Sequence, residues 1–344
     1  VNLGNVSLDG VYFFMKTYKN ETDDNLSVFV ERFNTDSPKD SLAPDFLLST
    51  KNIYLNNVTY RIQDNNQKDS ISFALKQAGV SVSDFRIQGA NVYANIRGMY
   101  FNLPTGIEVT NLSTNFSYTT TQMLFENTLI KTSNSVVQTD FQFNYLRDDL
   151  QFFTDKVGIK ANITQSDVAL ADLHKLYGEI DGTDVLHFKG VFDGSLNNFK
   201  IKDFNLVSDQ GMKITSEMSF KNLLSADKGL LFDANIENIN SNYKQLKSIL
   251  PNILGETLPS ELARLGNFDL SGKTFVSADK INANILINSQ IGRAKADLEL
   301  SETAVIDNAN YKGKISLTNF NLGAFLSNPI LGDVSLEVDV NGAG

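Results

Sequence analysis

Short runs in which apolar and polar residues alternate recur along almost the whole chain. In one of the clearest, Ile281, Ala283, Ile285 and Ile287 are separated by polar residues. A period of two is typical of a β-strand with one buried face, because successive side chains of a strand point to opposite sides. The sequence therefore predicts an all-β protein whose many short strands share one continuous apolar face.

The expected sheet is long. With strands of about 5–6 residues and a turn after each, the chain holds roughly twenty strands, which at ~4.8 Å per strand extend on the order of 100 Å. Such a sheet cannot leave its apolar face flat in water. Two alternatives remain at this point: a sandwich or stack of hairpins that buries the face internally, and a curled trough whose apolar inside holds lipid tails.

Helical patterns are few and short. Pro251 must break or kink the longest of them, because proline lacks the backbone N–H and crowds the preceding turn. Helices are expected at 25–34, 242–254, 259–266 and 322–326. We expect one continuous elongated domain, divided into 1–160, 161–240, a Pro-interrupted amphipathic helical insert at 241–266, and 267–344.

Composition narrows the classes of function. The chain is 42% hydrophobic and 20% charged, so it can bury a sizeable apolar surface. Its net charge is −10, which argues against nucleic acid and against electrostatic docking on an anionic membrane. The absence of Cys excludes disulfides, thiolate metal sites and Cys nucleophiles.

No pattern of catalytic or metal-ligating residues emerges. His174 and His187 fall in different elements, and we interpret both as solvated or hydrogen-bonded histidines. The adjacent acids Asp148 and Asp149 are expected in a turn, whereas paired catalytic carboxylates usually come from separate elements. The acidic run 21–25 lacks the ligand spacing of an EF-hand. We predict no enzyme, no metal site and no cofactor.

The ends of the sequence suggest a segment of a longer protein. No apolar run approaches the ~20 residues that span a bilayer, and no signal peptide precedes Val1. Any membrane anchor is expected outside the segment.

Two triplets of the form Asp-Ser-apolar are predicted O-glycosylation sites. They are centred on Ser41 and Ser70. This pattern matches the one that some Bacteroidota use for periplasmic O-glycosylation.

Several loose motifs together resemble the TamB proteins of Bacteroidota, in the AsmA-like superfamily. Ser7-Leu-Asp-Gly-Val11, an aromatic strand, Thr17-Tyr-Lys19 and Asn25-Leu26 resemble the stretch after that family's membrane anchor. Leu250-Pro251-Asn-Ile-Leu254, Leu258-Pro259 and Leu265-Gly266 resemble its Pro-punctuated helical insert, and Asn319-Phe-Asn-Leu-Gly323 also matches. The resemblance rests on the order and spacing of these motifs over nearly the whole chain.

The resemblance implies a β-taco, a curved antiparallel sheet with an apolar groove. It implies a periplasmic location, an N-terminal inner-membrane anchor outside this chain, and a BamA-like outer-membrane assembly protein as partner, of the TamA type or a lipoprotein homologue. The function implied is transfer of phospholipid acyl chains between the inner and outer membranes in support of outer-membrane biogenesis.

The predicted groove lining consists of the apolar members of the alternating runs. They are Val80, Val82, Phe85, Ile87, Val92, Ala94, Ile96, Met99, Phe101, Leu103, Phe116, Tyr118, Phe141, Phe143, Ile214, Met218, Phe220, Phe232, Ala234, Ile236, Ile281, Ala283, Ile285, Ile287, Ala296, Leu298, Leu300, Ile315, Leu317, Leu336 and Val338. One alternative is a chaperone groove that pairs with unfolded outer-membrane strands. A carbohydrate-binding or adhesin module is disfavoured by the absence of Trp.

Overall fold

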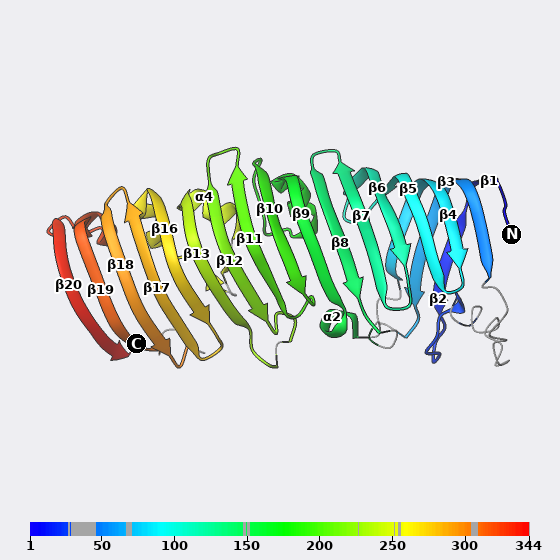
Figure 1. Cartoon of the computed structure of the whole chain (residues 1–344). Coiled ribbons are helices and arrows are strands. Elements are labelled where there is room, and N and C mark those ends of the chain that lie inside the picture. Colours follow the sequence, from blue (N-terminus) through cyan, green and yellow to red (C-terminus); the bar gives the residue numbers. More distant parts are fainter. Residues whose placement is uncertain are drawn as a thin grey trace. The chain divides into compact units, whose positions relative to one another are not determined.

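The computed structural model confirms the all-β fold with a few short helices. Strands make up 65% of the structure and helices 11%. An open, curved sheet contains 18 of the strands (Figure 1). The described residues are 1–26, 28, 46–66, 71–146, 149, 152–225, 227–250, 252–253, 256–303 and 309–343. They divide into two compact units, Val1–Asp140 and Phe141–Gly344, called unit 1 and unit 2 below.

Unit 1 is a meander with a parallel edge. Its strands are β1 (Asn5–Asp9), β2 (Tyr12–Thr17), β3 (Leu47–Asp64), β4 (Ile71–Gln88), β5 (Asn91–Asn102), β6 (Glu108–Tyr118) and β7 (Gln122–Thr132). From β3 to β7 each strand pairs antiparallel with the next. Both β1 and β2 run parallel to β3 along its length, and Gly10, at φ 68°, marks the break between them.

Unit 2 continues the strand pattern and contains the helices α2 to α5, whereas unit 1 has helical residues at 25, 26 and 28. Its strands are β9 (Gly158–Ala169), β10 (Val185–Gly194), β11 (Phe199–Ser208), β12 (Lys213–Lys221), β13 (Leu231–Asn242), β16 (Asn267–Val276), β17 (Lys280–Ser289), β18 (Gly292–Ser301), β19 (Asn310–Asn321) and β20 (Asp333–Ala343). Each pairs antiparallel with the next in this order. The strand β8 (Val136–Asn144) crosses the boundary between the units.

The short elements of unit 2 lie between strands. They are α2 (Phe153–Lys156), α3 (Leu170–Leu176), α4 (Tyr243–Ile249), the pair β14 (Asn252–Ile253) and β15 (Glu256–Thr257), the 3₁₀ helix η2 (Ser260–Leu265) and α5 (Leu322–Leu326). The expected insert thus contains α4 and η2. The side chain of Asn242 caps α4 by accepting from the Gln245 N–H, and Gly266 ends η2 at φ 68°. Pro251 and most of the helix expected at 25–34 lie outside the described residues.

Bulges keep the apolar residues of several strands on one face. Asp203, at φ 51°, lies in the register shift between Ile201 and Phe204. Those two residues pair with Met218 and Ser216, which lie on one side of β12. Asn and Asp tolerate this left-handed backbone better than most residues. The bulge therefore lets two apolar residues that are three positions apart point to the same face of the sheet, as residues two positions apart normally do. It also bends the strand.

The same device recurs in both units. The non-glycine residues with left-handed backbone at shifts of register are Asn57, Gln77, Asp84, Asn127, Asp203 and Asn319. Repeated bulges are a known source of curvature in sheets. The positions of Asn and Asp within the apolar runs thus contribute to the curvature of the sheet.

Candidate functional site

In unit 2 the registers align the apolar residues in rows that cross the strands. Row 1 consists of Phe188, Leu206, Ile214, Ile239, Leu270, Ile287, Ala294, Leu317 and Leu336. Row 2 consists of Phe204, Ser216, Ile236, Gly272, Ile285, Ala296, Ile315 and Val338. Together with the two rows below, they form what we call the apolar face of unit 2.

Rows 3 and 4 lie nearer the other ends of the strands. Row 3 consists of Ala161, Phe192, Ile201, Met218, Ala234, Thr274, Ala283, Leu298, Gly313 and Val340. Row 4 consists of Ile159, Gly194, Phe199, Phe220, Phe232, Val276, Ile281, Leu300, Tyr311 and Gly342. The rows include every groove-lining residue predicted from Ile214 onward.

Unit 1 brings most of its predicted residues together in the same way, whereas Phe85 pairs with Thr50 of β3 and has no partner in β5. Val82 pairs with Ile96, Ile87 with Val92, and Val80 with Met99 across β4 and β5. The next strands extend these rows, through the pairs Val92–Tyr118, Ala94–Phe116, Phe101–Val109, Tyr118–Met123 and Phe116–Phe125. Leu103 lies just beyond β5, in the turn where its N–H bonds the Ile107 carbonyl.

Among the described residues of unit 2, helices pack against the apolar face at one end of its strands. Leu170 of α3, Leu246 of α4 and Leu265 of η2 form a buried cluster with Leu206, Ile214 and their row 1 neighbours. We call this end of the strands the helix margin; α4 marks it in Figure 1. Ile214 is buried in this cluster, and Ile287 and Leu317 pack against it. These predicted groove residues therefore belong at least partly to the core.

The residues of rows 3 and 4 lie outside that cluster. A ladder of phenylalanine rings crosses these rows, with centroids 4.6 Å apart for Phe192 and Phe199, 4.9 Å for Phe199 and Phe220, and 4.9 Å for Phe220 and Phe232. All four side chains are half-buried. Ring spacings of this size are favourable beyond the area buried. The ladder thus gives this half of the face an ordered apolar surface.

Phe192 and Phe199 were missed as groove residues by the sequence interpretation. The signal was present, since Phe199 alternates with Ile201 directly after the turn of the β10–β11 hairpin. The register pairs β10 with β11 as a hairpin whose turn is 195–198.

The opposite face of unit 2 carries ion pairs. Glu299 lies 3.2 Å from Lys280 and 3.4 Å from Lys312, and Glu337 lies 2.8 Å from Lys314. The hydrogen bond from Lys280 is the main cause that lowers the pKa of Glu299, and the bond to Glu337 raises the pKa of Lys314. Exposed pairs of this kind contribute little to stability. They identify this face as the solvated one.

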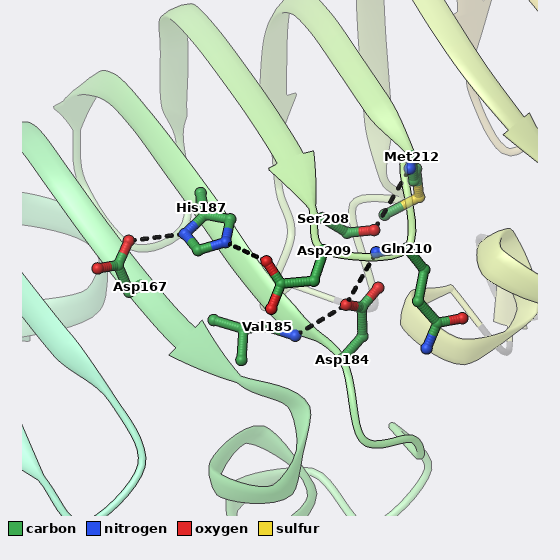
Figure 2. A network of polar contacts seen from close by, with 8 residues as sticks. All are labelled: Asp167, Asp184, Val185, His187, Ser208, Asp209, Gln210 and Met212. Atoms are coloured by element: carbon green, nitrogen blue, oxygen red, sulfur yellow. Dashed lines mark hydrogen bonds and ion pairs between the residues drawn. The ribbon is translucent and has the colours of Figure 1, made fainter.

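His187 is held on the sheet by two carboxylates. Its Nδ1 lies 2.8 Å from Asp167 Oδ1 and its Nε2 lies 2.8 Å from Asp209 Oδ1 (Figure 2). The hydrogen bond to Asp167, followed by that to Asp209, raises the pKa of His187. The side chain is partly exposed and neither carboxylate is buried. The arrangement is that of a surface hydrogen-bonded histidine, as the sequence predicts for it.

Other polar groups near His187 serve the local turns. Asp184 accepts from the backbone N–H groups of Val185 and Gln210, and Ser208 accepts from that of Met212 (Figure 2). His174 Nδ1 lies 2.7 Å from the Ile180 carbonyl oxygen. Across the described ranges, no group of three or more His, Asp or Glu side chains could hold a metal ion.

Some predicted sites have no structural description. Ser41 and Ser70 lie outside the described residues, as does Asp148.

Phe141 and Phe143 lie in β8, where their rings meet edge to face at 5.7 Å.

No family model, curated protein or solved structure matches the chain. Among the residues that the structure describes, no helix is long and apolar enough to span a membrane.

Proposed function

We propose that the apolar face binds the acyl chains of phospholipids. The observation that carries this proposal is that the buried cluster of unit 2 includes residues of row 1 but none of rows 3 and 4. The helices pack against row 1, in which Leu206 and Ile214 are buried, whereas the phenylalanine ladder of rows 3 and 4 lies outside the buried cluster. An ordered apolar surface beside a solvated, ion-paired face is suited to a flexible apolar ligand.

The physical chemistry of acyl chains fits this surface. Each CH₂ group removed from water contributes ~0.8 kcal/mol, so a row of Phe, Ile, Leu and Val side chains replaces part of a bilayer core without specific contacts. The charged headgroup can remain in water, which avoids the cost of burying a phosphate. A lining with few polar groups offers no deep local minimum, so a lipid can move along it.

At the level of the whole protein, we propose a segment of a TamB-like bridge in the periplasm. In this proposal the segment carries phospholipids between inner and outer membranes, is anchored to the inner membrane outside this chain, and acts with a BamA-like partner. The sequence motifs support it, together with a curved, mostly antiparallel sheet that has an apolar face.

A charge placed on either side of one strand tests lipid binding. Ile285 is half-buried in row 2, and the preceding residue, Asn284, is exposed on the solvated face. We expect Ile285→Asp to reduce the phospholipid that co-purifies with the chain by at least about tenfold, and Asn284→Asp to leave it unchanged. Mass spectrometry of extracted lipids measures both, and circular dichroism checks that both variants fold.

Three outcomes would contradict the proposal. Absence of lipid from the wild-type chain would remove its basis, and peptide in its place would favour the chaperone groove. Unfolding of Ile285→Asp would show that row 2 belongs to a closed core, as in the sandwich alternative. The pair Ile96→Asp and Asn95→Asp repeats the comparison in unit 1, where only Asn95 is exposed.

A further inference from the structure

The end of the unit 2 strands opposite the helix margin carries exposed apolar side chains on connecting segments. We call it the loop margin; it comprises the segment 152–156 with α2, the β10–β11 turn at 195–198, and the β12–β13 turn at 222–225, and α2 marks it in Figure 1. Its exposed large apolar side chains are Phe152, Phe153, Leu196, Leu223 and Leu224.

A buried asparagine joins these three segments. Asn197 is only 2% exposed, and its Nδ2 donates to Asp155 Oδ1 at 2.6 Å and to Ser225 Oγ at 2.8 Å. Its Oδ1 accepts from the Leu224 N–H at 2.8 Å. The Asn197 backbone also donates to the Thr154 carbonyl and accepts from the Leu223 N–H. The apolar side chains are thus presented by segments that are fixed to one another.

Neighbouring polar groups also bond within these segments. Ser195 Oγ accepts from the Asn198 N–H, Asn198 Oδ1 accepts from the Asn222 N–H, and Thr154 Oγ1 donates to Asp155. These segments therefore expose Leu and Phe side chains beside polar groups that already have local partners, and beside the exposed Lys156. An apolar surface edged by polar and charged groups suits the interface of a lipid bilayer, where headgroups and tails lie next to each other.

The loop margin is continuous with the open half of the apolar face. Phe199 of the ladder directly follows the 195–198 turn, and Phe220 comes two residues before the 222–225 turn. The ring of Phe153 lies 5.7 Å from that of Phe143 in β8. Exposed leucines also occur at the helix margin, so the exposure of apolar side chains does not by itself identify one margin as a docking surface. Continuity with rows 3 and 4 distinguishes the loop margin.

Charge identifies the class of lipid surface. Lys156 Nζ lies 3.7 Å from Asp149 Oδ1 and 4.7 Å from the centroid of Phe152. Lys200 and Lys221 are also exposed at this margin, in one depression with Asp193. Basic and acidic side chains are therefore mixed there, and the chain as a whole has a net charge of −10. Attraction to anionic headgroups needs clustered Lys or Arg, so the surface favoured is one of zwitterionic phospholipid.

We propose that the loop margin docks on a zwitterionic phospholipid surface and inserts its Leu and Phe side chains between the headgroups. This inference rests on the proposed function, because it names the place where acyl chains enter the apolar face. Docking brings row 4 next to the lipid tails. A lipid then reaches the phenylalanine ladder without passing its tails through water.

Flotation of the full chain with phosphatidylcholine vesicles tests this inference. The double variant Leu223→Asp/Leu224→Asp is expected to reduce flotation by at least about tenfold. The matched control, Leu326→Asp/Ile330→Asp at the helix margin, is expected to change it by less than about twofold. The control pair is at least as exposed as the test pair, since Leu326 and Ile330 are 52% and 90% exposed and Leu224 and Leu223 are 57% and 43% exposed. If the first variant fails to fold, Leu196→Asp replaces it.

Lipid content of the purified protein separates this inference from the proposed function. If the wild-type chain carries phospholipid but does not float, or floats only with anionic vesicles, the loop margin is not the docking surface and the apolar face remains a lipid site. Equal losses in the two double variants would also overturn the inference. Absence of lipid from the purified chain would instead contradict the proposed function.

Discussion

The helix margin and the loop margin of unit 2 belong to the same strands but differ in what covers them. At the helix margin, the connections between strands carry apolar residues of their own, such as Leu170 and Leu246, and these form a buried cluster with Leu206 and Ile214 of row 1. At the loop margin, the turns consist largely of Asn and Ser whose polar groups bond to one another, as Asn197 shows. The alternation within a strand selects a face, and the connections decide which part of that face is buried.

The largest difference in stability is expected when one phenylalanine is truncated in the buried cluster at the helix margin and another in the phenylalanine ladder. Phe268 is 3% exposed in the cluster at the helix margin, whereas Phe220 is half-buried in the ladder. We expect Phe268→Ala to lower the free energy of unfolding by about 3–5 kcal/mol, because it leaves a cavity. Phe220→Ala should lower it by about 1–2 kcal/mol through lost ring contacts.

Urea denaturation followed by tyrosine fluorescence measures both, since the chain has 11 Tyr and no Trp. Equal losses would mean that rows 3 and 4 are as closed as row 1. That result would favour the sandwich over an open face.

The next prediction concerns the polar network of the loop margin. Asn197→Ala removes the amide that bonds Asp155, Ser225 and the Leu224 N–H. We expect the free energy of unfolding to fall by about 1–3 kcal/mol, because buried polar partners lose their bonds. The exposed Asn284 serves as control, and Asn284→Ala should change the free energy by less than about 0.5 kcal/mol. Similar losses in the two variants would show that the network does not hold this margin.

The smallest effect is expected at His187, on the solvated face. Its folded-state pKa is raised by Asp167 and Asp209, so protonation favours the folded protein. The stabilisation is fully present below the unfolded pKa of about 6.5 and is lost as pH rises through the higher folded value. The difference in urea midpoint between wild type and His187→Gln should therefore be larger at about pH 5 than at about pH 8. The opposite trend would mean that the carboxylates do not hold the protonated ring.

Much of the fold follows from local patterns. The spacing of Ile281, Ala283, Ile285 and Ile287 predicts both a strand and the side chains of one face, and the structure places all four in the rows. The cap at Asn242 and the end of η2 at Gly266 were likewise readable. The bulges were not predicted, although an apolar spacing of three with Asn or Asp before the second apolar residue, as at Asp203, was a usable signal.

What covers the face could not be read from the pattern. Ile214 and Phe220 alternate on the same strand and look equivalent in sequence, yet Ile214 is buried and Phe220 is not. Alternation is a local property, because it depends on the geometry of one strand. Burial of Ile214 depends on α3, α4 and η2, which come from other parts of the chain and dock only in the tertiary structure. The sequence thus determined which side chains share a face, and long-range packing decided which of them lie in the core.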